Sequence, residues 1–98
     1  MELLQIDDKY VAALKTFNLN VEDALSEFII LNLSKKISEF RNDCEMYEKK
    51  YDIDFKGFEN RIKEKINDED FEEEDDYLAW KFADESRSLL KKRLEEIL

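Results

Sequence analysis

The sequence has no proline and only one glycine, Gly57, so it has little of the two residues that most readily end or bend a helix. Charged residues make up 43% of the chain and hydrophobic residues another 43%, with leucine, glutamate, lysine and isoleucine prominent among them. Most of these residues favour helices. The 98 residues suffice for one core of ordinary size. We therefore expect a mainly α protein.

Histidine is absent and Cys44 is the only cysteine. The chain thus has no intrachain disulfide, and it lacks both the usual zinc ligand and the side chain that most often transfers protons at neutral pH. Stretches starting at Asp52 and Asp68 approach the spacing of an EF-hand, but neither has the required glutamate at its twelfth position. We predict no catalytic residue, no metal site and no cofactor.

Long apolar runs are also missing, since no run is longer than five residues, and residues 28–31 form one of the longest. The start, MELLQIDDKY, has no basic end followed by an apolar stretch, as an export signal would. We expect a cytoplasmic protein that does not enter a membrane. The formal net charge of −10 repels nucleic acid phosphates and suits a basic protein partner better.

Polar residues mark the start of two helices. Residues 3–6 could form a very short strand or simply the entry to a helix. Asp7 and Asp8 then suit the beginning of a helix over residues 8–17. Asn18 can adopt the left-handed conformation that ends this helix. Asn20 then suits the N-cap of a second helix over residues 21–51. At 1.5 Å per residue that helix would be about 46 Å long, too long for a globule of this size to cover.

The long helix carries a coiled-coil-like seam, in which apolar residues follow one another at alternating intervals of three and four. The predicted dimer interface consists of Ile30, Leu33, Ile37, Phe40, Cys44, Tyr47 and Tyr51. A second group of apolar residues lies before this seam in the same helix. Between residues 21 and 33 the helix is therefore apolar on two sides, and other parts of the protein must cover both. We predict a homodimer, and the alternative is that both sets pack inside a single-chain bundle.

Two further helices are expected after residue 52. Asp54 can cap the third helix, with Ile53 and Phe58 placed to form a hydrophobic staple. Eight of the nine residues 68–76 are acidic, and so dense a run of like charge favours a linker. The fourth helix is expected from about residue 74 to the end of the chain, as an amphipathic helix whose apolar positions include Leu78, Phe82 and Leu89.

Large aromatic residues lie within and just after the acidic run. Tyr77 and Trp80 are offset from the stripe of the fourth helix and broaden its apolar surface at one end, which is typical of an anchor for a partner. The predicted partner-binding residues are Phe71, Glu72, Glu73, Glu74, Asp75, Asp76, Tyr77 and Trp80. The alternative is a charged linker that leads into a helix whose aromatics belong to the core.

The segment LLQIDDKYVAALKTFNLNVEDALSEFIILNL resembles a ribbon-helix-helix antitoxin over the first third of the chain. The segments YEKKYDIDFKGFENRI and FEEEDDYLAWKFADESRSLLKKRLEEIL are similar to small acidic helical antitoxins of prokaryotic toxin–antitoxin pairs. The resemblance implies that the chain neutralises a basic RNA-cleaving toxin by covering it. Residues 1–52 would then form the dimerisation region, and residues 53–98 the partner-binding arm.

Two other functions are compatible with the sequence. The chain could be a structural or adaptor protein that uses its long helix as a dimeric spacer. It could also be a DNA-binding autoregulator, in which paired N-termini place Lys9, Lys15, Lys35 and Lys36 on phosphates. Its strand would then have only Gln5 to read bases, since the neighbouring residues are apolar.

Overall fold

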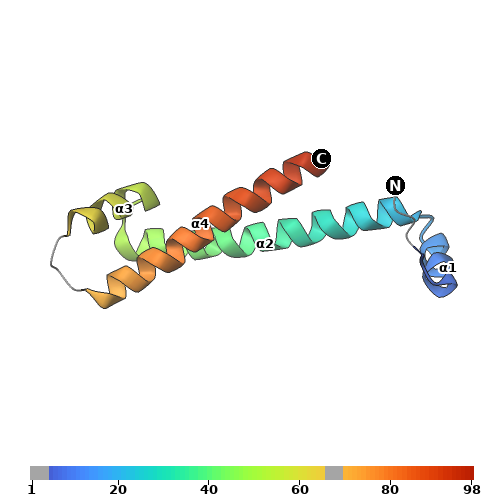
Figure 1. Cartoon of the computed structure of the whole chain (residues 1–98), viewed down its shortest axis with the longest axis horizontal. Coiled ribbons are helices and arrows are strands. Elements are labelled where there is room, and N and C mark those ends of the chain that lie inside the picture. Colours follow the sequence, from blue (N-terminus) through green and yellow to red (C-terminus); the bar gives the residue numbers. More distant parts are fainter. Residues whose placement is uncertain (1–4, 66–69) are drawn as a thin grey trace.

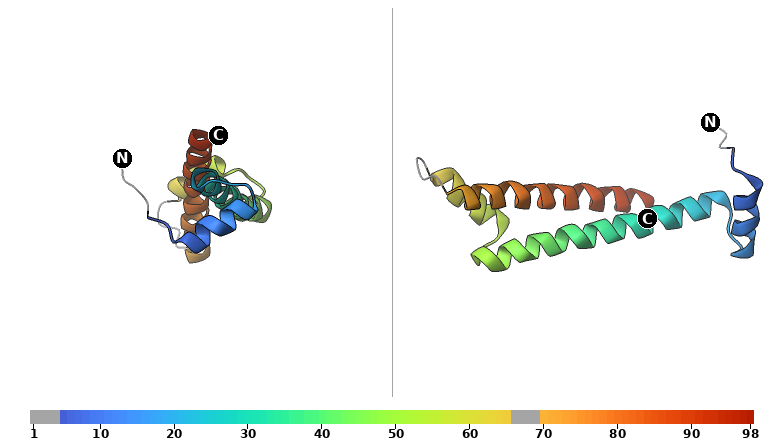
Figure 2. Two further views of the ribbon diagram at one scale, coloured as in Figure 1. Left: turned by 90° about the vertical axis from the view of Figure 1, so that its right-hand side faces the viewer. Right: turned by 90° about the horizontal axis from the view of Figure 1, so that it is seen from below.

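The computed structural model describes residues 5–65 and 70–98, and within them the chain forms four helices (Figure 1). They are α1 (Asp8–Thr16), α2 (Val21–Tyr51), α3 (Phe55–Glu64) and α4 (Phe71–Ile97). The molecule is elongated and measures 62 × 27 × 22 Å. Helices α2 and α4 run antiparallel along its length, with α3 at one end and α1 at the other (Figures 1 and 2). The mainly α prediction is confirmed.

The bounds predicted for the long helix, residues 21–51, are confirmed. The Asn20 side chain accepts a hydrogen bond of 2.8 Å from the backbone N–H of Asp23, which caps the first turn of α2. At the other end Asp52 has a left-handed backbone with φ 53°, and this conformation stops the helix. Asn18 is likewise left-handed, with φ 59°, and turns the chain between α1 and α2.

The start of α3 also follows its local sequence. The Asp54 side chain accepts a hydrogen bond of 2.8 Å from the N–H of Gly57. Ile53 lies directly over this turn, so a Cβ atom at Gly57 would come within 2.6 Å of Ile53 Cδ1. A larger residue at position 57 would therefore displace the Ile53 side chain, which occupies that space.

The hydrophobic core lies where α2, α3 and α4 meet. Trp80 of α4 and Phe58 of α3 are completely buried there, next to Cys44 and Ala83. The Trp80 ring stacks on Tyr47 at a centroid distance of 5.8 Å and contacts Phe58 at 5.3 Å. Aromatic contacts at these distances add stabilisation beyond burial alone. This cluster fixes α3 and the beginning of α4 against the end of α2.

Helix α4 begins earlier than the expected residue 74, because the acidic run is helical from Phe71. The Asp70 side chain caps the helix by accepting a hydrogen bond of 3.2 Å from the N–H of Glu73. Cations from α2 and from the end of α3 then pair with the acids of the run, as described below. Their charges relieve the repulsion on which the linker prediction rested. Residues 68 and 69 of that predicted linker lie outside the described residues.

The predicted N-terminal strand is not seen. Leu3 and Leu4 lie outside the described residues, while Gln5 and Ile6 are irregular and lead into the Asp7 cap of α1. A strand needs a second strand to satisfy its backbone, and the described residues of this chain form none. Among the helices described here, none is long and apolar enough to cross a membrane.

Candidate protein-binding surfaces

Most of the predicted dimer seam faces α4 of the same chain. Ile37 and Cys44 are buried, and the aromatic rings of Phe40, Tyr47 and Tyr51 pack against the cluster around Trp80. In the single chain these five side chains therefore contact the protein's own core. The two remaining members of the predicted interface, Ile30 and Leu33, are only half-buried. Dimerisation through the seam stays a prediction.

The predicted partner-binding residues divide between two sides of α4. Four of them point inward: Trp80 is completely buried, Glu73 is buried, and Asp76 and Tyr77 are half-buried. The other four, Phe71, Glu72, Glu74 and Asp75, are exposed. The acidic–aromatic segment thus contributes to the core and to the surface at the same time.

The inward carboxylates pair with cations of α2 and of the end of α3. Glu73 accepts hydrogen bonds from Arg61 and Lys65. The Lys50 ammonium lies 2.6 Å from Asp76 Oδ2 and 2.7 Å from Glu72 Oε1. These hydrogen bonds to Asp76 and then Glu72 raise the pKa of Lys50 above its ordinary value. Helix α4 is held to its neighbours by charge as well as by the core.

The Asp76 carboxylate also accepts a hydrogen bond from the Tyr51 hydroxyl. Burial, together with this hydrogen bond, raises the pKa of Tyr51 to about 12. Burial alone would raise the pKa of Asp76, but the hydrogen bonds from Lys50 and Tyr51 outweigh it and lower that pKa. Asp76 is therefore a structural anion, charged at neutral pH and partly shielded from solvent.

Tyr77 has a similar internal role. Its hydroxyl donates a hydrogen bond of 2.7 Å to Glu59 Oε2 of α3, and its ring stacks on Phe55 at 5.9 Å. The hydrogen bond raises the pKa of Tyr77 and lowers that of Glu59. Tyr77 and Trp80 are thus the core side of α4, as in the alternative interpretation of the sequence.

The opposite side of α4 carries an exposed apolar stripe. At about 100° of rotation per residue, these positions lie roughly 160–200° around the helix from Trp80. The stripe consists of Phe71, Leu78, Phe82 and Leu89, with exposed fractions from 54% to 68%. The Phe82 ring also contacts Phe40 of α2 edge to face, at a centroid distance of 5.7 Å. The exposed carboxylates of Glu74, Asp75 and Glu85 lie beside the stripe. We call these seven residues the outer face of α4.

Sequence reasoning found the apolar residues of α4 but did not determine which of them meet the core. Both sides of α4 have helical spacing, so periodicity alone does not say which one meets the core. The decisive contacts come from the rings of Tyr47, Tyr51, Phe55 and Phe58, which surround Trp80. Aromatic size does not separate the two sides either, since Tyr77 and Trp80 lie on one and Phe71 and Phe82 on the other.

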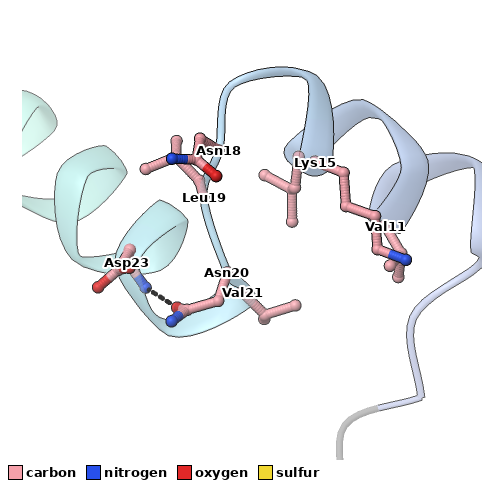
Figure 3. Close-up of a pocket in the computed structure, with 8 residues that line it drawn as sticks. Val11, Lys15, Asn18, Leu19, Asn20, Val21 and Asp23 are labelled. Carbon is pink, nitrogen blue, oxygen red and sulfur yellow. Dashed lines mark hydrogen bonds between the residues drawn. The ribbon is translucent and has the colours of Figure 1, made fainter.

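A second apolar surface lies at the other end of the molecule, where α2 continues beyond the end of α4 (Figure 1). Leu25, Phe28, Ile29 and Leu31 are exposed there. Next to them, α1 crosses the start of α2 and leaves an open groove of about 530 Å³ (Figure 3). Its lining includes the apolar residues Val11, Leu14, Leu19 and Val21. The apolar residues of α2 between positions 21 and 33, which were expected to be covered on two sides, are therefore only partly covered.

No group of three or more cysteine or acidic side chains in residues 5–65 and 70–98 is placed to hold a metal ion. Burial raises the pKa of the Cys44 thiol, which disfavours its reactive thiolate. The two exposed apolar surfaces, on α4 and at the start of α2, are candidate surfaces for binding another protein. No family model matches the chain, and comparisons with curated proteins and with solved structures find no match either.

Proposed function

We propose that this chain is a non-catalytic protein-binding module of the antitoxin kind. In this proposal the outer face of α4 covers a basic surface of an RNA-cleaving protein and blocks it. The chain would act as a homodimer. The observation that supports the proposal is that four large apolar side chains stand exposed in one row among carboxylates.

Such a row has the two properties that a specific interface for a basic protein needs. Phe71 and Phe82 supply aromatic contact area, and residues of this type often dominate binding energy when a partner covers them. Glu74, Asp75 and Glu85 add negative charge around them. Charge of this sign attracts a basic partner and speeds the encounter.

The internal ion pairs stabilise the start of α4 as a helix, which supports binding by its outer face. Lys50 holds Glu72 and Asp76, and Arg61 and Lys65 hold Glu73, so the acid-rich start of α4 is already helical before any partner arrives. A preformed helix loses less conformational entropy on binding than a flexible acidic segment does. The inward acids therefore support binding by positioning the outward residues.

The test is whether the full chain binds and inhibits a small basic nuclease encoded by the adjacent gene. The binding constant is measured by calorimetry, and inhibition by the rate of RNA cleavage. Leu78→Lys should raise the dissociation constant by at least about tenfold, because it places a cation in the centre of the apolar row. Met46→Lys is the matched control, since Met46 is an exposed apolar residue on α2.

A second pair of variants tests the charge. Changing Glu74 and Asp75 to lysine should weaken binding and reduce its dependence on salt. Changing Glu45 and Glu48 of α2 to lysine alters the net charge equally and should have a smaller effect. If the wild-type chain binds no such nuclease, or if Leu78→Lys binds as tightly as Met46→Lys, the proposed function is wrong.

A further inference from the structure

The exposed part of α2 has one side that is suited to contact another helix. Glu22, Leu25, Ile29, Leu33 and Lys36 follow one another at intervals of three and four residues, so they share this side. Leu25 and Ile29 are exposed, and Leu33 is half-buried. Continuing at the same spacing leads to Phe40, Cys44 and Tyr47, which face α4. The side of α2 that α4 covers thus continues toward the helix start, where α4 ends (Figure 1).

The charges on this side are arranged symmetrically about Ile29. Glu22 and Lys36 each lie seven residues from Ile29, and Leu25 and Leu33 each lie four residues from it. An antiparallel copy centred on Ile29 would place its Lys36 opposite Glu22 and its Leu33 opposite Leu25. A parallel copy would instead place Glu22 opposite Glu22 and Lys36 opposite Lys36, and like charges repel.

We propose that two copies of this chain pair through residues 21–36 of α2, antiparallel, with the two-fold axis at Ile29. Ile29 of each copy then meets its own counterpart, and the two leucines on either side complete an apolar centre. Two Glu22–Lys36 pairs close the ends of the contact. A symmetric, self-complementary surface of this kind is what a two-fold dimer requires.

Net charge also favours a second copy at this place. Residues 21–36 contain three acids and two lysines, a net charge of −1, which leaves −9 for the rest of the chain. Because most of the negative charge lies outside residues 21–36, electrostatic repulsion between two copies is weakest at this segment. The present partner of Lys36 is Glu39, at 3.2 Å, and both side chains are about half exposed. Such a surface pair contributes little, so Lys36 can exchange it at small cost.

This inference deepens the self-association that belongs to the proposed function, but it moves the interface. The predicted seam ran from Ile30 to Tyr51, and α4 covers its later part within the single chain. Pairing through residues 21–36 leaves both the core and the outer face of α4 unchanged. Partner capture and self-association can therefore be measured separately.

The experiment is sedimentation equilibrium of the full-length chain over a range of concentrations. Glu22→Lys and Lys36→Glu should each raise the dissociation constant of the dimer by on the order of tenfold, since each converts two attractive pairs into repulsive ones. The double variant, Glu22→Lys with Lys36→Glu, should restore most of the affinity. Glu27→Lys is the matched control, because Glu27 projects from the opposite side of α2.

Orientation is tested by cysteine substitution and a short bis-maleimide cross-linker. Ile29→Cys should cross-link to its own copy, whereas Leu25→Cys and Leu33→Cys should cross-link efficiently only when the two variants are mixed. Parallel helices would let every one of these positions cross-link to itself. Native Cys44 is 2% exposed and reacts slowly, and the wild-type chain serves as its control.

Several results would overturn the inference: a monomer at all concentrations, a dimer insensitive to the two charge reversals, or efficient cross-linking of Leu25→Cys alone. Ile29→Lys separates the inference from the proposed function, because it should weaken the dimer by on the order of a hundredfold while the outer face of α4 stays intact. A monomeric wild-type chain that still captures the basic nuclease overturns only this inference. A dimer with the expected orientation that captures none overturns only the proposed function.

Discussion

The ammonium of Lys50 lies 2.6 Å from the carboxylate of Asp76, and this ion pair joins the last turn of α2 to the early part of α4. The pair forms across 26 residues of sequence, inside a run of acids that would oppose a helix on their own. It lies beside the aromatic core, where Tyr51 donates a hydrogen bond to the same carboxylate. We expect the stability of the folded chain to depend on this contact between α2 and α4.

The first prediction concerns Asp76 and its neighbour in sequence. Asp76→Ala should lower the free energy of unfolding by about 1–2 kcal/mol, because it leaves the hydroxyl of Tyr51 and the ammonium of Lys50 without their shared acceptor. Asp75→Ala is the control, since Asp75 is exposed and should change stability by less than about 0.5 kcal/mol. Urea unfolding followed by circular dichroism measures both. Equal effects of the two variants would contradict the structural role of Asp76.

The second prediction concerns stability at alkaline pH. The pKa of Tyr51 is about 12 in the folded chain and about 10 in an unfolded one, so the folded state holds the phenol proton more tightly. The resulting stabilisation is complete below about pH 10 and is lost as the pH rises toward 12. The raised pKa of Lys50 acts in the same direction. Tyr51→Phe should therefore flatten the pH dependence of unfolding in this range, and an unchanged slope would show that other groups cause it.

The third prediction separates the two sides of α4. Trp80→Ala should destabilise the chain by about 3–5 kcal/mol, because it opens a cavity in the centre of the aromatic cluster. Leu78→Ala removes a side chain that is 62% exposed and should cost less than about 1 kcal/mol. Thermal or urea unfolding of both variants gives the comparison. A large loss of stability from Leu78→Ala would place that side chain in the core and argue against the outer face of α4 as a free surface.

The fourth prediction concerns the start of α2. Asn20→Ala removes the side chain that accepts a hydrogen bond from the backbone N–H of Asp23. The first turns of α2 should be destabilised by about 1 kcal/mol. Because α4 does not extend to this end of α2, the effect should be local, with faster amide exchange around residues 21–25 and little change around Trp80. Asn42→Ala, an exposed change within the same helix, is the control. Uniform loss of protection along α2 would mean that the helix unfolds as one unit.

Local signals in the sequence predicted much of the helical framework. Asn20 and Asp54 are hydrogen-bonding caps, Asn18 is left-handed, and the bounds of α2 are those expected from the absence of breakers before Asp52. Each of these features depends on side chains within a few residues of the backbone that they satisfy. They can therefore be found without knowing what else the chain contacts.

The candidate site was predicted only in part, because it depends on which side of α4 meets the core. Phe71, Glu74 and Asp75 were expected at the surface and are exposed there. Trp80 was expected as an anchor for a partner and instead lies at the centre of the chain's own aromatic cluster. Leu78 and Phe82 were expected as apolar positions of the fourth helix, and they lie exposed on the outer face of α4.

The sequence by itself determined that the chain is helical, where α2 starts and stops, and that it has more apolar surface than one small core can hide. These properties follow from composition, caps and periodicity, which act over a few residues. The tertiary structure decided that the acidic run becomes the start of α4, and which of its side chains point outward. The reason is that Lys50 and Arg61 and the rings around Trp80 come from distant parts of the chain, and only folding brings their charge and their apolar surface to α4.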